Sequence, residues 1–413
     1  MAADGRQPSL APVRGRTRVL FVAENVSLAQ VVRLHVLSRC LDPARYEVWF
    51  ASCGYDPLIF SGAQPRRYPI ESMSAAAAMR RVERGGQLYD TRTLAGYVRE
   101  DLAMLEHVQP ALVIGDLRLS LAVSAPKLGV PYAALINAYW SPYGLRERFP
   151  VPEHPIVRWL GYERVAPHVG RALPFVFDHF ARPINLLRRR HGLPAIGSLL
   201  EVLTFGDHTL HPDVPELTPL AGAPAGHRFL GPVLWSPELP LPAALERLPE
   251  SRPLVYVTLG STGSLRVLRA LLQALATLPL HVLLATAGRF RTRELPANVI
   301  PVDFVPGGEA ARRARLVICN GGSSTAYQAL HEGVPVLGLP FNFDQSLAMA
   351  AIERTGAGRA VRLGEARPEV LRAHIAELLH DEAAHAAAAR LALALRRVDS
   401  AQRFREFVRA IVP

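Results

Sequence analysis

The residues that point most directly to chemistry form a turn between a predicted strand and a predicted helix. Residues 314–318 are largely apolar, and residues 319–325 then read Cys-Asn-Gly-Gly-Ser-Ser-Thr. Glycine lets the backbone approach an anion closely, and the first turn of a helix presents free N–H groups and a positive dipole end. The turn is therefore predicted to bind the phosphate groups of a small molecule, with the Thr325 hydroxyl as a further donor.

The elements that must position this turn are buried strands that alternate with helices. In the first half, strands are predicted at residues 18–23, 46–51, 111–115 and 131–136, with helices at 28–41, 93–107 and 120–128. A second series has strands at 255–259, 281–286, 299–302 and 316–319, with helices at 265–278 and 307–313. This alternation predicts an α/β protein with two doubly wound domains, which bind ligands near the C-terminal ends of their strands.

Polar and proline-rich segments indicate the domain boundaries. The expected parts are a frayed tail at 1–16, a first Rossmann-like domain at 17–233, a Pro-rich linker at 234–253 and a second Rossmann-like domain at 254–395. Helical patterns follow at 369–380 and 382–412, and the segment 396–413 is expected to cross back onto the first domain.

Composition narrows the classes of protein and of partner. No apolar run approaches the roughly 20 residues of a membrane-spanning helix, and three scattered cysteines, Cys40, Cys53 and Cys319, favour a cytoplasmic location without disulfides or a metal site. The net charge of +11 comes almost entirely from arginine, since Lys127 is the only lysine. This excess indicates either attraction to anionic ligands and membrane headgroups or a base-composition bias of the genome. No nucleic-acid motif is present, so nucleic acid is not expected as a partner.

The order of motifs in the second half resembles the family 1 (UDP-glycosyltransferase-like) glycosyltransferases of GT-B architecture, in particular the bacterial natural-product and lipid type. The resemblance rests on residues 229–232 (Phe-Leu-Gly-Pro), 258–261 (Thr-Leu-Gly-Ser), 287–289 (Ala-Gly-Arg), 303–306 (Asp-Phe-Val-Pro) and the nucleotide-sugar signature at 320–345. It implies two Rossmann-like domains that face each other across a cleft, with the donor sugar nucleotide held by the second domain.

The resemblance also assigns residues to the donor. They are Ser261, Thr262, Arg289, Phe304, Val305, Asn320, Gly321, Gly322, Ser323, Ser324, Thr325, Gln328, Asp344 and Gln345. The glycine and hydroxyl residues would bind the diphosphate, the backbone at 304–305 would flank the base, and Asp344 with Gln345 would meet sugar hydroxyls. Members of the family need no metal or other cofactor, and no Asp-x-Asp metal motif occurs in this sequence.

Two positions of the donor signature depart from the family pattern. Asn320 replaces a histidine before the glycines and cannot become cationic. Gln328 replaces a glutamate that takes both ribose hydroxyls, and the loss of this charge-assisted bond matters less for a deoxyribose. A dTDP-deoxysugar is therefore slightly favoured as donor, while a UDP-sugar remains open.

The position of the family's catalytic histidine is also changed. It falls on Gln30, and an amide cannot act as a base. Asp116 fits the aspartate that normally orients this histidine. Glu24, in the loop after the first strand, is the preferred candidate base, and Asp116 is the other carboxylate candidate. Glu24 can equally be a helix-start carboxylate, and an acceptor that ionises easily would need little base.

The acceptor is expected in the first domain. Tyr139, Trp140 and Tyr143 begin an aromatic-rich segment that either lines an apolar acceptor pocket or fills the core. Arg182 and the arginines at 188–190 either meet an anionic acceptor or membrane surface, or form a solvated helix face.

The sequence thus predicts an inverting, metal-independent glycosyltransferase that moves a sugar from a nucleotide diphosphate to a small hydrophobic acceptor such as a natural product or lipid. The alternatives are a nucleotide-sugar 2-epimerase of the same architecture and a degenerate protein that only binds nucleotide sugars. The sugar, the acceptor and the oligomeric state are left open.

Overall fold

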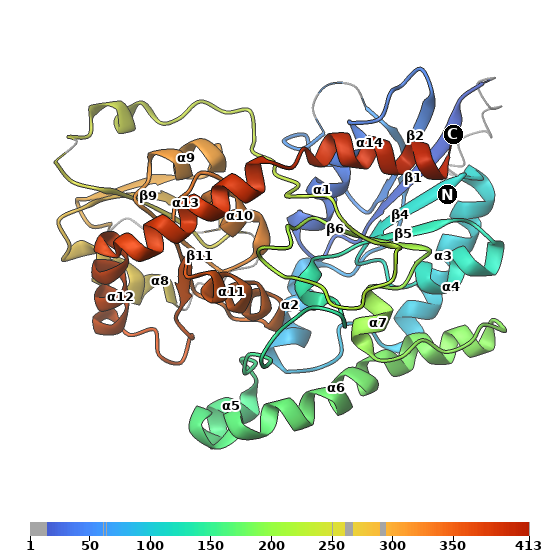
Figure 1. Cartoon of the computed structure of the whole chain (residues 1–413), viewed down its shortest axis with the longest axis horizontal. Coiled ribbons are helices and arrows are strands. Elements are labelled where there is room, and N and C mark those ends of the chain that lie inside the picture. The colour runs from blue at the N-terminus through green and yellow to red at the C-terminus, as the bar shows by residue number, and fades with distance from the viewer. Residues whose placement is uncertain are drawn as a thin grey trace, which may run out of the picture.

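Two parallel sheets, each covered by helices, make up the protein (Figure 1). The computed structural model describes residues 15–60, 62, 64–249, 251–260, 267–289 and 295–412. The first sheet has seven strands in the order β3-β2-β1-β4-β5-β6-β7, and the second has six in the order β10-β9-β8-β11-β12-β13. These two sheets confirm the predicted α/β class with two doubly wound halves.

The first sheet belongs to residues before the linker. Its strands are β1 (Thr17–Ala23), β2 (Tyr46–Ser52), β3 (Arg66–Pro69), β4 (Leu112–Asp116), β5 (Tyr132–Leu135), β6 (His208–His211) and β7 (His227–Phe229). The accompanying helices are α1 (Leu28–Ser38), α2 (Ala75–Glu83), α3 (Thr91–Val108), α4 (Leu121–Leu128), the short η1 (Ala138–Trp140), α5 (Pro155–Leu160), α6 (Tyr162–Arg190) and α7 (Leu199–Leu203).

The second sheet follows the linker, which contains the short helix η2 (Ala243–Arg247). Its strands are β8 (Leu254–Thr258), β9 (His281–Ala285), β10 (Val299–Val302), β11 (Leu316–Cys319), β12 (Val336–Gly338) and β13 (Gly358–Ala360). The helices are α8 (Leu268–Ala276), α9 (Gly307–Arg313), α10 (Ser323–His331), α11 (Phe343–Thr355), α12 (Pro368–His380), α13 (Glu382–Arg396) and α14 (Ser400–Ile411).

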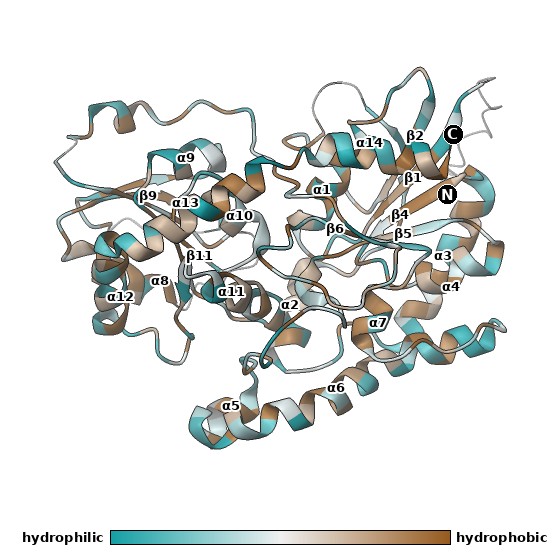
Figure 2. Cartoon of the chain, viewed as in Figure 1, coloured by the Kyte–Doolittle hydropathy of each residue, from teal (hydrophilic) through white to brown (hydrophobic). Residues whose placement is uncertain are grey.

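The central strands are apolar because helices cover both of their faces. In β1 the five residues from Val19 to Ala23 are all fully buried, and they alternate between the two faces of the sheet. Strands buried on both sides read as continuous apolar runs. Figure 2 shows this concentration of hydrophobic residues on β1 and β4.

The C-terminal helical segment is divided between the two halves. The pattern predicted at 382–412 is two helices, because Asp399 begins α14 by accepting a hydrogen bond from the Gln402 backbone N–H. Helix α13 packs into the core of the second half, while Phe404 and Phe407 of α14 pack against β1 of the first half. Figure 1 shows the two helices running across both halves of the molecule.

Candidate active site

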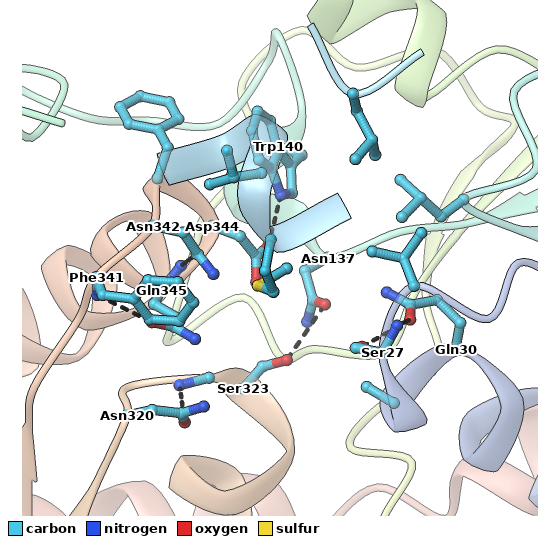
Figure 3. A pocket seen from close by; sticks show the side chains of 18 of the residues that line it. Ser27, Gln30, Asn137, Trp140, Asn320, Ser323, Phe341, Asn342, Asp344 and Gln345 are labelled. Carbon is cyan, nitrogen blue, oxygen red and sulfur yellow. Dashed lines mark hydrogen bonds between the residues drawn. The ribbon is translucent and has the colours of Figure 1, made fainter. Parts of the chain in front are cut away.

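A single cavity of about 1150 Å³ lies between the two sheets. Its lining includes residues at or just beyond the C-terminal ends of strands in both halves: Asp116 at the end of β4, Asn137 after β5, Gly260 after β8 and Asn320 after β11. The C-terminal ends of parallel strands are the usual ligand sites of such sheets. Figure 3 shows side chains from both halves meeting in this cavity.

The predicted phosphate-binding turn opens onto the cavity at the start of α10. Gly322 is the N-cap of this helix, and the Asn320 side-chain oxygen accepts a hydrogen bond from the Gly322 N–H at 3.1 Å. Gly321 has a φ of 77°, and a side chain at this position would place its Cβ 2.6 Å from Cγ of Met349. The turn therefore requires glycine, and it leaves the N-terminal N–H groups of α10 facing the cavity.

Most of the predicted donor residues lie around this turn. Those that line the cavity are Phe304, Val305, Asn320, Gly322, Ser323, Ser324, Thr325, Gln328, Asp344 and Gln345. Gly321 shapes the turn without lining the cavity, and Arg289 donates from Nη1 to the Gly260 carbonyl at 2.9 Å, outside the lining. Ser261 and Thr262 lie outside the described residues.

Gln328 is held by the linker. Its side-chain amide donates to the Trp235 carbonyl and, at 3.3 Å, to the Ser236 hydroxyl. These bonds fix the orientation of the carboxamide at the wall of the cavity. A glutamate at this position could not donate either of them.

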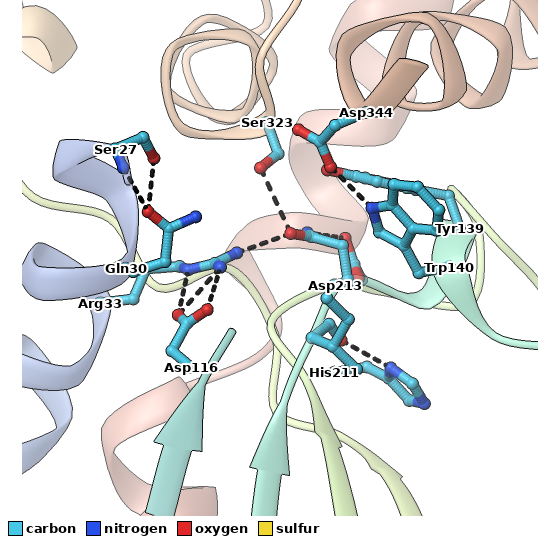
Figure 4. Close-up of polar contacts among 12 residues, drawn as sticks. Ser27, Gln30, Arg33, Asp116, Tyr139, Trp140, His211, Asp213, Ser323 and Asp344 are labelled. Carbon is cyan, nitrogen blue, oxygen red and sulfur yellow. Dashed lines mark hydrogen bonds and ion pairs between the residues drawn. The ribbon is translucent and has the colours of Figure 1, made fainter. Parts of the chain in front are cut away.

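Asp344 connects the two halves of the protein. Its Oδ1 accepts a hydrogen bond from Trp140 Nε1 at 2.7 Å and another from the Tyr139 hydroxyl at 3.1 Å (Figure 4). Burial raises the pKa of the Asp344 carboxyl, and the Trp140 bond opposes this effect. The carboxylate is thus fixed at the cavity wall by two aromatic donors from the first half.

Asp116 forms a buried ion pair with Arg33, one turn beyond Gln30 on α1. Arg33 donates from Nε to Asp116 Oδ2 at 3.1 Å and from Nη2 to Oδ1 at 3.0 Å (Figure 4). Burial raises the pKa of Asp116 to about 6, although the guanidinium opposes this shift. A carboxylate with a pKa near neutrality that lines the same cavity as the turn is suited to accept a proton.

A polar network continues from Arg33 into the second half. Arg33 Nη1 donates to Asn137 Oδ1 at 2.6 Å, and Asn137 Nδ2 donates to Asp213 at 2.9 Å. Asp213 also accepts from the Tyr327 hydroxyl on α10, and the Ser323 hydroxyl donates to Asn137 at 3.4 Å. The carboxylate region and the phosphate turn are therefore joined by side-chain contacts.

Of this network, Ser323 was predicted from the sequence as a donor residue, whereas Arg33, Asn137, Asp213 and Tyr327 were not. Arg33 could have been found from its spacing, because residues three apart on a helix lie on the same face and Gln30 was already a candidate. Asn137 and Asp213 follow β5 and β6 at the ligand-binding edge, which is also a recognisable signal. Nothing in the local sequence indicates the contact of Asp213 with Tyr327.

The other two catalytic candidates have structural partners. The Gln30 side-chain oxygen accepts from the Ser27 N–H at 2.9 Å and from its hydroxyl at 2.6 Å, which makes a capping box at the start of α1. Glu24 is fully buried, is paired with Arg118 at 3.0 Å and is not among the cavity-lining residues. Burial raises the pKa of Glu24, and Arg118 opposes this effect. The geometry favours Asp116 over Glu24 as a base.

The far end of the cavity is apolar. Helices α2, α6 and α7 contribute aliphatic and aromatic side chains, among them Met79, Leu173, Phe177 and Leu199. Of the three aromatic residues predicted for the acceptor, Trp140 lines the cavity and Tyr139 is buried against Asp344. Tyr143 instead packs against His227, with ring centroids 5.2 Å apart, and is not among the lining residues.

Within the described ranges no group of three or more His, Cys, Asp or Glu residues could hold a metal ion. In the same part of the chain, no helix combines the length and apolar character needed to cross a membrane.

Comparisons with known proteins identify relatives over nearly the whole chain. The family described as "Erythromycin biosynthesis protein CIII-like, C-terminal domain" matches residues 269–397. The "PGL/p-HBAD biosynthesis glycosyltransferase" of Mycobacterium tuberculosis is 45% identical over 397 residues, which cover 95% of this chain and 92% of that protein. The "PGL/p-HBAD biosynthesis rhamnosyltransferase" of Mycobacterium bovis is also 45% identical over 397 residues, or 95% of this chain and 87% of the relative.

The fold is shared with solved glycosyltransferase structures. "Spinosyn Rhamnosyltransferase SpnG" superposes with a TM-score of 0.69 at 23% identity and covers 96% of this chain and 99% of its own. The same protein has been solved in complex with thymidine diphosphate, with a TM-score of 0.68 at 22% identity over 95% of this chain and all of its own. The chain therefore belongs to the family 1 glycosyltransferases of GT-B architecture, and the predicted enzyme class is confirmed.

Proposed function

We propose that this glycosyltransferase moves a sugar from a nucleotide diphosphate to an apolar, lipid-type acceptor, by a metal-independent reaction that inverts the anomeric centre. The observation that carries the proposal is the single cavity, which joins the phosphate turn at one end to an apolar chamber at the other. The names of the relatives in PGL/p-HBAD biosynthesis support a related acceptor class for this chain.

Asp116 is the proposed base. It lines the cavity between the turn and the apolar chamber, and Arg33 holds the orientation of its carboxylate. The acceptor hydroxyl oxygen attacks the anomeric carbon, its proton passes to Asp116, and the bond from that carbon to the diphosphate oxygen breaks. A single displacement of this kind inverts the configuration.

The leaving diphosphate would be stabilised by the protein itself. The free N–H groups at the start of α10 and the hydroxyls of Ser324 and Thr325 provide donors, and the helix dipole favours negative charge at that end. These groups would supply the electrostatic stabilisation that a metal provides in other transferases.

A dTDP-sugar is the proposed donor. The Gln328 side-chain amide donates a hydrogen bond to the Trp235 carbonyl. Because this residue is a glutamine, the position offers no carboxylate that could accept hydrogen bonds from both hydroxyls of a ribose. A deoxyribose lacks the 2′-hydroxyl and loses less from this substitution. The binding of thymidine diphosphate by the structurally similar SpnG is consistent with this choice.

A donor panel tests the proposal. Thermal shifts are measured with dTDP and UDP and their sugars, followed by nucleotide diphosphate release with and without long-chain phenol acceptors. We expect stabilisation by the dTDP compounds and release only when an acceptor is present. Donor turnover without an acceptor would indicate the epimerase alternative, and binding without release under every acceptor would indicate a degenerate binding protein.

A further inference from the structure

Helices α5 and α6 carry an unusual number of exposed apolar residues. Among the described residues, eleven large hydrophobic side chains are exposed, and six of them lie on these two helices: Ile156, Trp159, Leu160, Tyr162, Phe175 and Val176. Trp159 is 82% exposed and Phe175 is 76% exposed. Single exposed hydrophobics are common, but a cluster of this kind marks an interaction surface.

This surface is continuous with the acceptor end of the cavity. Ile156, Phe175 and Val176 are exposed and also line the cavity. On the same helix, Leu173 and Phe177 are buried in the apolar cluster beneath. An apolar molecule on the outer face of α6 would therefore have a route into the cavity along apolar side chains.

The exposed face of α6 is also cationic. Arg164, Arg171 and Arg182 are all exposed, and their spacing of 7 and 11 residues places them on the same side of the helix as Phe175. The exposed acidic residues of α6 are fewer, namely Glu163 and Asp178. Phe175 and the acidic Asp178 lie on this side of α6 with the three arginines, and most of the other exposed apolar residues lie on the neighbouring α5. Exposed apolar side chains combined with arginines are typical of helices that lie on anionic lipid surfaces.

We propose that the α5–α6 face docks on the surface of an anionic lipid bilayer, so that a lipid acceptor passes from the membrane into the cavity without crossing water. The inference rests on the proposed function for the identity of the acceptor. The arginines would attract the anionic headgroups, while Trp159 and Phe175 would insert at the interface, where aromatic rings are favoured.

Vesicle co-sedimentation of the full chain tests the docking. The vesicles contain phosphatidylcholine alone or phosphatidylcholine with phosphatidylglycerol. We expect binding to the anionic vesicles only, and a roughly 100-fold loss in the Trp159→Ser/Phe175→Ser variant. The Arg171→Glu/Arg182→Glu variant should also bind less tightly than wild type, by a factor that is largest at low salt and shrinks as salt screens the charges. Leu393→Ser is the matched control, because Leu393 is 59% exposed on α13 and lies outside this face.

The docking and the proposed function fail in different ways. Equal binding by wild type, the aromatic variant and the arginine variant, or no binding to anionic vesicles, would overturn the docking even if a soluble acceptor is glycosylated. A dimer that the same substitutions dissolve would show that a second copy covers this face, and would also overturn it. Vesicle binding without transfer to any acceptor would refute the proposed function and leave the docking supported. If both hold, a Trp159→Ser variant, which changes no cavity-lining residue, keeps its kcat/KM for a water-soluble phenol and loses activity with an acceptor embedded in anionic vesicles.

Discussion

Replacing Arg33 with methionine should make the stability of the protein depend more strongly on pH. The substitution keeps a long side chain in place but leaves the buried Asp116 carboxyl without its two hydrogen bonds from the guanidinium. Without this partner the pKa of Asp116 must rise above its present value of about 6, because burial and the charge of Asp344, which both raise it, then act unopposed. The folded variant should therefore keep its Asp116 proton to a higher pH than wild type does.

The sign and size of the effect follow from linkage. A carboxyl whose pKa is higher in the folded state than its ordinary 3.8 stabilises the fold most at low pH and loses that contribution as pH rises through the folded pKa. In wild type this stabilising contribution is fully lost slightly above pH 6, whereas in Arg33→Met the loss extends to higher pH. The difference in unfolding free energy between wild type and Arg33→Met should be constant below about pH 6. Above that pH it should widen by about 1 kcal/mol per pH unit.

Urea unfolding at about pH 5, 7 and 8 measures this gap. The control is the double variant Arg33→Met/Asp116→Asn, which has no carboxyl to titrate and should show a gap that does not widen. A wild-type to Arg33→Met difference that stays constant between pH 6 and 8 would refute the reasoning, as would equal widening in the double variant.

Three other substitutions test the donor end of the cavity. Gly321→Ala should raise the donor KM more than tenfold, because it combines a positive φ with a clash against Met349; an unchanged KM for the donor would contradict the proposed turn. Gln328→Glu removes the hydrogen bond to the Trp235 carbonyl and supplies a carboxylate. The ratio of kcat/KM for UDP-sugars to that for dTDP-sugars should therefore rise by about tenfold. An unchanged ratio would exclude a role of Gln328 in donor preference. Asp344→Ala removes the acceptor of two interdomain hydrogen bonds. It should lower the unfolding free energy by about 1–3 kcal/mol and raise the donor KM. A loss of stability without a change in KM would indicate a purely structural residue.

The fold and the glycine turn before α10 were predictable because their signals are local. Strands buried on both faces appear as apolar runs, and the turn before α10 requires glycine wherever it occurs. The capping box of Ser27 and Gln30 is also local, and its Ser-x-x-Gln pattern was open to recognition. The confirmed architecture depends on signals of this kind.

The chemistry of the site depends instead on distant contacts. Arg33 and Asp116 are 83 residues apart, and Asp213 and Tyr327 are 114 apart. Glu24 and Asp116 look alike in the sequence, since both follow an apolar strand, yet Arg118 pairs with Glu24 in the core. Which carboxylate reaches the cavity is decided by packing between elements, and a local pattern cannot report it.

The central claim is that sugar transfer takes place beside Asp116 in the shared cavity. The most direct test measures nucleotide diphosphate and glycosylated acceptor together, for wild type and Asp116→Asn, across the pH range around 6. The account predicts equal amounts of the two products, a wild-type rate that falls below pH about 6 as Asp116 takes up a proton, and a rate at least 100-fold lower in the variant, with no such fall. A variant that keeps the wild-type rate and pH profile, or diphosphate release without a glycosylated product, would contradict it.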